Sequence, residues 1–209
     1  MFELNYTKME EKFYEISHGW ATKYFWLDPD WNVQKGENSE ELIKKKVCDS
    51  FIPKSGTTSA DILGNSLVLN IYSENLVEFL NKHNADLKTF PIKIVLPEKV
   101  KNKEIPNYYY VEPKSFIDSM RDGSYLSKSE RKKFQENLDK WIRKKYKIYY
   151  EGHEVRKDFY NLSSWNQSDF FGAKYTKMII VTDRLKKIIE GAKLKNIKFT
   201  ELKILENGI

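Results

Sequence analysis

Residues 70–96 read NIYSENLVEFLNKHNADLKTFPIKIVL, and residues 179–205 read IIVTDRLKKIIEGAKLKNIKFTELKIL. Each stretch has a short apolar run, a hydroxyl residue followed by an acid, a helical pattern, and a second apolar run. Ser73-Glu74-Asn75-Leu76 aligns with Thr182-Asp183-Arg184-Leu185 at an offset of 109 residues, and Phe90 aligns with Phe199 at the same offset. The repetition predicts two similar strand–helix–strand units.

The start of each predicted helix is defined by the chemistry of its first residues. Ser73 and Thr182 can act as N-caps, because a side-chain oxygen accepts a hydrogen bond from a free backbone N–H in the first helical turn. The acid that follows each of them, Glu74 or Asp183, is favoured there by the helix dipole. Apolar residues then recur at helical spacing. We expect the first helix to end near residues 82–84.

The rest of the chain predicts further strands and one more helix. Strands are expected around 12–17, 21–27 and 108–111, polar loops at 34–40 and 54–59, a helical turn at 114–121, and an irregular segment over 156–175. An aromatic-rich N-terminal portion, residues 1–60, precedes the portion with the two units, residues 61–209. We therefore predict a single α+β domain over residues 1–209, with a mainly antiparallel sheet and helices packed on it.

The composition indicates a soluble protein without disulfides. The chain has 209 residues, with 36 Lys and Arg against 30 Asp and Glu, so its net charge is +6. Cys48 is the only cysteine, which excludes an intramolecular disulfide and fits a reducing compartment. The N-terminus lacks the pattern of a signal peptide, and no apolar run is long enough to cross a bilayer. We expect a cytoplasmic protein that does not bind membranes.

No catalytic, cofactor or metal motif stands out in the sequence. The three histidines, His18, His83 and His153, lack the paired spacing that a zinc site needs, and we interpret them as solvated or hydrogen-bonded. The sequence has neither a nucleophile elbow nor a phosphate loop. We therefore expect no enzymatic activity, no cofactor and no bound metal.

A basic helix predicted over 127–145 offers one alternative function. Ser127 and Glu130 have the spacing of a capping box, and an apolar face follows at helical spacing. Cations flank this helix, and Tyr146, Tyr149 and Tyr150 follow it. Single-stranded nucleic acids are bound by such combinations, since phosphates contact the charges and bases stack on the rings. The cations are Lys128, Arg131, Lys132, Lys133, Lys140, Arg143, Lys144, Lys145 and Lys147.

The second repeat resembles the C-terminal part of the larger α+β immunity proteins of bacterial polymorphic toxin systems. The matching residues are 178–185, MIIVTDRL, and 199–202, FTEL. Residues 108–111, YYYV, and residues 169–171, DFF, resemble the middle of that family, so the similarity covers roughly residues 61–206. Some members carry paired CxxCG motifs, which this chain lacks.

The resemblance implies a non-enzymatic cytoplasmic protein that binds and neutralises a cognate protein toxin. A basic inhibitor suits an acidic toxin, because complementary charge speeds association. Aromatic residues dominate the energetics of protein interfaces, and several occur in the segment 156–175. From that segment we predict four partner-binding residues, with core packing beneath a loop as the alternative interpretation: Tyr160, Trp165, Phe170 and Phe171.

Overall fold

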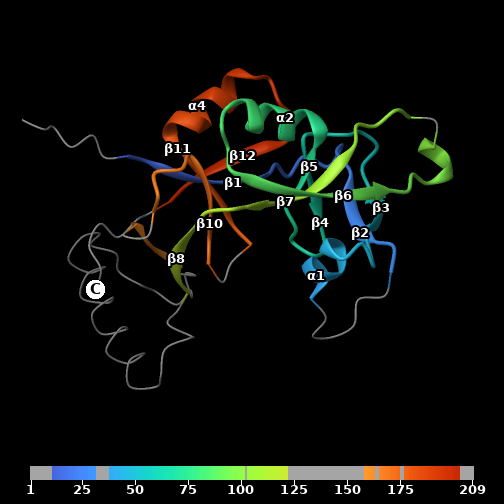
Figure 1. Ribbon diagram of the computed structural model, residues 1–209. Coiled ribbons are helices and arrows are strands. Elements are labelled where there is room, and N and C mark those ends of the chain that lie inside the picture. The colour runs from blue at the N-terminus through green and yellow to red at the C-terminus, as the bar shows by residue number, and fades with distance from the viewer. Residues whose placement is uncertain are drawn as a thin grey trace, which may run out of the picture.

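The computed structural model describes residues 11–31, 38–101, 103–121, 158–162, 165–174 and 177–202. These residues form a mixed α and β structure with mostly strands and few helices (Figure 1). No helix among them combines the length and apolarity needed to cross a bilayer. The elements are β1 (Phe13–His18), β2 (Trp26–Pro29), α1 (Ser39–Lys44), β3 (Ser50–Ser55), β4 (Ile62–Asn65), β5 (Ile71–Ser73), α2 (Glu74–Lys82), β6 (Leu87–Ile94), the 3-10 turn η1 (Glu98–Val100), β7 (Tyr108–Pro113), β8 (Phe116–Arg121), β9 (Asp158–Asn161), β10 (Phe170–Ala173), β11 (Ile179–Thr182), α4 (Asp183–Gly191) and β12 (Ile197–Glu201).

The strands form a closed barrel and an open sheet. Read round the barrel, the strand order is β6-β7-β5-β4-β2-β3, and a parallel pairing of β3 with β6 closes it. The order in the open sheet is β12-β1-β11-β10-β8-β9. Most pairings are antiparallel, and the parallel exceptions include β2 with β4 and β8 with β10. In the open sheet, β1 lies between β11 and β12, which come from the far end of the chain.

Helices α2 and α4 begin with the same set of contacts. The Ser73 hydroxyl accepts the N–H of the third helical residue at 3.2 Å and donates to Asp61 Oδ1 at 2.6 Å. The Thr182 hydroxyl accepts the equivalent N–H at 3.3 Å and donates to Asp169 Oδ1 at 2.6 Å. The backbone N–H of each cap residue also donates to the carbonyl oxygen of the same aspartate. The predicted caps are therefore confirmed, and α2 ends at Lys82 as expected.

Helices α2 and α4 lie on the same side of the strands and share one hydrophobic core (Figure 1). A second core fills the barrel, and a third lies on the opposite face of the open sheet. The shared core ties the barrel to the open sheet, because both contribute to it. Its fully or nearly buried members include Ile16, Tyr72, Leu76, Leu80, Val111, Phe170, Val181, Leu185 and Ile189.

Some predicted elements differ from the structure. The prediction of a helical turn at 114–121 is wrong, because most of this segment is strand β8, which pairs with β10 and β9. The segment 156–175, expected to be irregular, contains β9 and β10. The polar loop expected at 34–40 ends in helix α1, because the Asn38 side chain accepts from two backbone N–H groups. The predicted basic helix over 127–145 lies outside the described residues.

Candidate functional site

Three of the four aromatic residues predicted to bind a partner, Trp165, Phe170 and Phe171, lie in or next to the cores. Phe170 and Phe171 are both 0% exposed, Phe170 in the shared core and Phe171 on the opposite face of the open sheet. Trp165 is half-buried, makes an edge-to-face contact with Phe13 at 4.9 Å, and donates its indole N–H to a backbone carbonyl. The backbone of Tyr160 pairs with β8. Core packing therefore explains Phe170 and Phe171, whose rings offer no surface to a partner.

A different group of aromatic residues surrounds a pocket beside the barrel. Residues 19–25 connect β1 to β2 and pack against the loop after β3, where Phe25 N–H donates to Thr58 O at 3.0 Å and Thr57 N–H donates to Lys23 O at 3.0 Å. Gly56, with a φ of 78°, permits this packing, because a Cβ atom there would lie 2.0 Å from a carbonyl oxygen of the connection. The connection is thus held in place.

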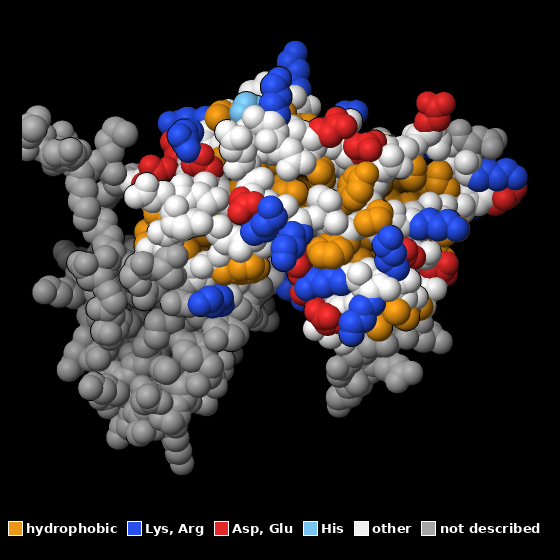
Figure 2. Space-filling view, in the orientation of Figure 1, with side chains coloured by type: hydrophobic (Ala, Val, Ile, Leu, Met, Phe, Trp, Pro, Cys, Tyr) orange, Lys and Arg blue, Asp and Glu red, His pale blue; other side chains and the backbone are white. Residues whose placement is uncertain are grey.

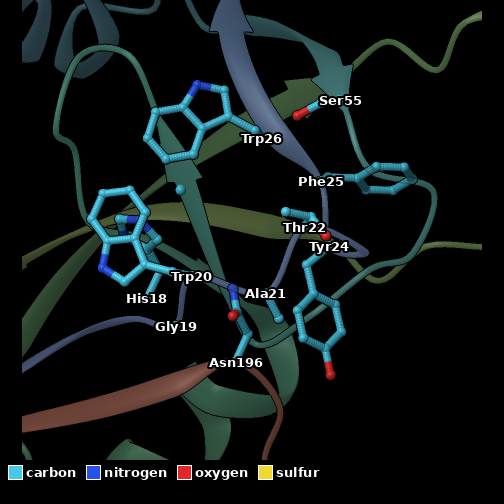
Figure 3. Close-up of a pocket in the computed structure, with 11 residues that line it drawn as sticks. His18, Gly19, Trp20, Ala21, Thr22, Tyr24, Phe25, Trp26, Ser55 and Asn196 are labelled. Carbon is cyan, nitrogen blue, oxygen red and sulfur yellow. The ribbon is translucent and has the colours of Figure 1, made fainter.

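Three rings form one side of this aromatic pocket, which has a volume of about 230 Å³ (Figure 3). The His18 ring lies 4.9 Å from the Trp20 ring and 5.5 Å from the Trp26 ring, between ring centroids. The two indoles stack with centroids 6.1 Å apart. Trp20 is nonetheless 72% exposed, which is unusual for so large an apolar side chain. The structure therefore presents a free indole surface at the pocket.

Two buried polar atoms of the pocket, His18 Nε2 and Asn196 Oδ1, have no hydrogen-bond partner among the described residues. Asn196 is fixed in place, because its side-chain Nδ2 donates to Ile62 O at 2.7 Å and its backbone carbonyl accepts from Gly19 N–H at 2.8 Å. Burial, and secondly the charge of Lys198, lowers the pKa of His18 from its ordinary value of 6.5. The site therefore offers a fixed acceptor, and the lowered pKa of His18 favours the neutral form of its imidazole.

Two exposed lysines lie near the aromatic pocket. Lys23 Nζ lies 5.0 Å from the centroid of the Tyr24 ring, which lines the pocket, and the charge of Lys198 acts on His18, whereas Lys54 is paired with Asp28 at 3.8 Å. On the face shown in Figure 2, basic and acidic side chains are interspersed. A local group of cations favours association with an anionic partner. Lys23 and Lys198 thus place positive charge beside this pocket.

Sequence reasoning did not identify this site. Trp20 and Trp26 belong to the aromatic-rich N-terminal portion, and their proximity in sequence was the available signal. Asn196 lies at the other end of the chain, so only the fold shows that it joins them. Among the described residues, no group of three or more His, Cys, Asp and Glu side chains could hold a metal ion.

No protein-family model matches this chain, and a search of curated proteins gives no match. The assignment of a function therefore depends on the residues and on the geometry of the aromatic pocket.

Proposed function

We propose that this protein is a bacterial immunity protein that binds a cognate toxin in the cytoplasm and neutralises it by protein–protein contact, without catalysis. The observation that carries the proposal is Trp20, whose indole is 72% exposed beside a preformed pocket. Tryptophan is among the residues most enriched at the energetic centres of protein interfaces. The resemblance of residues 61–206 to immunity proteins supports the same function.

The surroundings of Trp20 fit capture of an acidic partner. The connection that carries Trp20 is anchored by backbone hydrogen bonds, so little ordering is needed on binding, and preorganisation increases affinity. The neighbouring lysines would accelerate the encounter with an acidic toxin. We therefore propose Trp20 and the aromatic pocket as the centre of the interface.

We also propose that the two strand–helix–strand units are equivalent. The barrel and the open sheet have matching strand orders if β6, β7, β5, β4, β2 and β3 correspond to β12, β1, β11, β10, β8 and β9. The paired contacts of Ser73 with Asp61 and of Thr182 with Asp169 support this correspondence. On this basis the first half of the chain comprises β1 to β6 and the second half comprises β7 to β12. β1 and β7 are then equivalent strands, and each pairs with strands of the other half.

Co-expression with the product of the adjacent gene tests the function. We expect restored growth and a stable complex that survives purification, and we expect Trp20→Ala to weaken that complex. Val47→Ala is the matched control, because Val47 is also an exposed apolar residue, at 65%, and does not line the pocket. Absence of both rescue and complex formation would reject the proposal.

A single-stranded nucleic-acid-binding module is the second candidate. An exposed indole beside lysines, as at Trp20, can stack on a base while the cations contact phosphates. Fluorescence anisotropy with labelled oligonucleotides would then show an affinity that falls steeply with salt. An unchanged anisotropy at low salt would exclude this alternative.

A further inference from the structure

If the two halves are equivalent, the region around the aromatic pocket in the first half can be compared with the corresponding region in the second half. A Cβ atom on Gly64 would lie 2.6 Å from the Trp26 ring and 2.9 Å from His18. A Cβ atom on Gly172 would lie 2.6 Å from the Phe116 ring and 2.8 Å from Pro113. The same arrangement thus recurs in the second half, with proline at the position of the histidine and phenylalanine at the position of the tryptophan.

The halves differ in the connection that follows. Residues 19–25 join β1 to β2, whereas residues 114–115 alone join β7 to β8. The short connection is sufficient to link equivalent strands, so the fold itself does not require the longer one. The longer connection carries Trp20 and supplies much of the pocket lining. The aromatic pocket is therefore an addition to the first half, and it leaves a large apolar side chain exposed to water.

We infer that the aromatic pocket binds one tyrosine or tryptophan side chain from an acidic segment of the partner protein. This inference rests on the proposed function and specifies its binding site. A volume of about 230 Å³ is below the range of roughly 300–1,000 Å³ that is usual for small-molecule sites, and it suits a single side chain. The free indole face of Trp20 is a surface for a second ring.

The polar atoms select a ring with a hydrogen-bond donor. Asn196 Oδ1 is a carbonyl oxygen and can only accept, and the bond from Nδ2 to Ile62 O fixes the orientation of the amide. A phenolic O–H or an indole N–H supplies the missing proton, whereas phenylalanine would leave the acceptor unsatisfied. The exposed lysines disfavour a cationic ligand and favour acidic residues beside the inserted ring.

A protein side chain fits these features better than a nucleic acid strand does. Grooves for single strands use several rings along their length to stack successive bases. Here Trp26 is stacked against Trp20, and Trp20 is the ring of this pocket that is largely exposed. The pocket thus offers one stacking face for one inserted group.

The test uses four fluorescein-labelled probes and the full chain. The first is a ten-residue peptide with one central tyrosine flanked by aspartate and glutamate, and the second replaces that tyrosine with phenylalanine. The third keeps the tyrosine but has lysine flanks, and the fourth is a ten-nucleotide oligothymidylate. Binding is followed by anisotropy, with wild type, Trp20→Ala, Asn196→Ala and the Val47→Ala control, each checked for folding by circular dichroism.

We expect the acidic tyrosine peptide to bind wild type and Val47→Ala equally and to lose binding with Trp20→Ala. The phenylalanine peptide should bind up to about tenfold more weakly, since it lacks the hydrogen bond to Asn196 Oδ1, and such a bond contributes about 0.5–1.5 kcal/mol. That difference should disappear in Asn196→Ala. Equal binding of both peptides, no binding of either, or tighter Trp20-dependent binding of the oligonucleotide would overturn the inference.

The site and the function can fail separately. If the co-expressed toxin binds wild type and Trp20→Ala with equal affinity, the function stands and the pocket is not the interface. If no toxin is captured but the acidic tyrosine peptide binds in a Trp20-dependent way, the pocket stands and the immunity function fails.

Discussion

Replacement of Ser73 by alanine should destabilise the protein more than the loss of an ordinary helix cap. Ser73 is 0% exposed, and its hydroxyl both caps α2 and donates to Asp61, which is only 7% exposed. Loss of an N-cap costs about 1 kcal/mol. A hydrogen bond to a charged group contributes about 1.5–3 kcal/mol, and here its loss affects a buried carboxylate.

The expected decrease in the free energy of unfolding is about 2–4 kcal/mol. The decrease should stay below the top of this range, because the other carboxylate oxygen of Asp61 keeps its hydrogen bond from Lys195 N–H at 2.6 Å. Urea denaturation followed by circular dichroism measures this decrease. The dependence of the free energy of unfolding on urea concentration should be the same in the variant as in wild type. Ser73→Thr should retain most of the stability, because threonine occupies the same role at position 182.

Asn38→Ala is the matched control, since Asn38 caps α1 from an exposed position without contacting a buried acid. Its cost should be about 1 kcal/mol. If Ser73→Ala costs no more than Asn38→Ala, the hydroxyl–carboxylate contact contributes nothing and the reasoning is refuted.

Three further predictions follow from other contacts. Gly64→Ala and Gly172→Ala should each lower the free energy of unfolding, measured with urea, by about 1–3 kcal/mol, since each added Cβ atom would lie 2.6 Å from an aromatic ring. Clearly unequal decreases would argue against equivalent halves. Tyr72→Phe should leave the free energy of unfolding unchanged or raise it by about 1 kcal/mol in the same assay, because the buried Tyr72 hydroxyl has no hydrogen-bond partner among the described residues. A decrease of more than about 1 kcal/mol would show that the hydroxyl has a partner. NMR titration should give His18 a pKa below 6.5, and this pKa should rise in Lys198→Gln. Because the unfolded chain then binds the proton more readily than the folded one, the free energy of unfolding should fall as pH drops from 6.5 towards the folded-state pKa. A pKa above 6.5 in wild type would contradict the burial of this ring.

The helices that follow Ser73 and Thr182 were predictable because their determinants are local. A cap, an acid and an apolar periodicity within a few residues specify where such a helix begins. Helix α1 carries a similar signal in Asn38, which the sequence analysis assigned to a loop. Segments with local signals were therefore accessible from the sequence.

Strand β8 and the aromatic pocket were not predictable because their partners are distant in sequence. Phe116 pairs with Gly172 across a parallel ladder, and nothing near residue 116 specifies that contact. His18 is half-buried only because Trp20, Trp26 and Asn196 surround it. Closure of the barrel likewise depends on β3 meeting β6. Long-range packing decides these features.

The position of β1 between β11 and β12 has a consequence for synthesis in the cell. Residues 13–18 leave the ribosome well before their partner residues 179–182 and 197–201. Until then the apolar side chains of this strand have no ladder to join, and exposed strands of nascent chains are prone to aggregate. The open sheet is therefore completed only after residues 197–201 have emerged, and until then the nascent chain is a natural client for a chaperone.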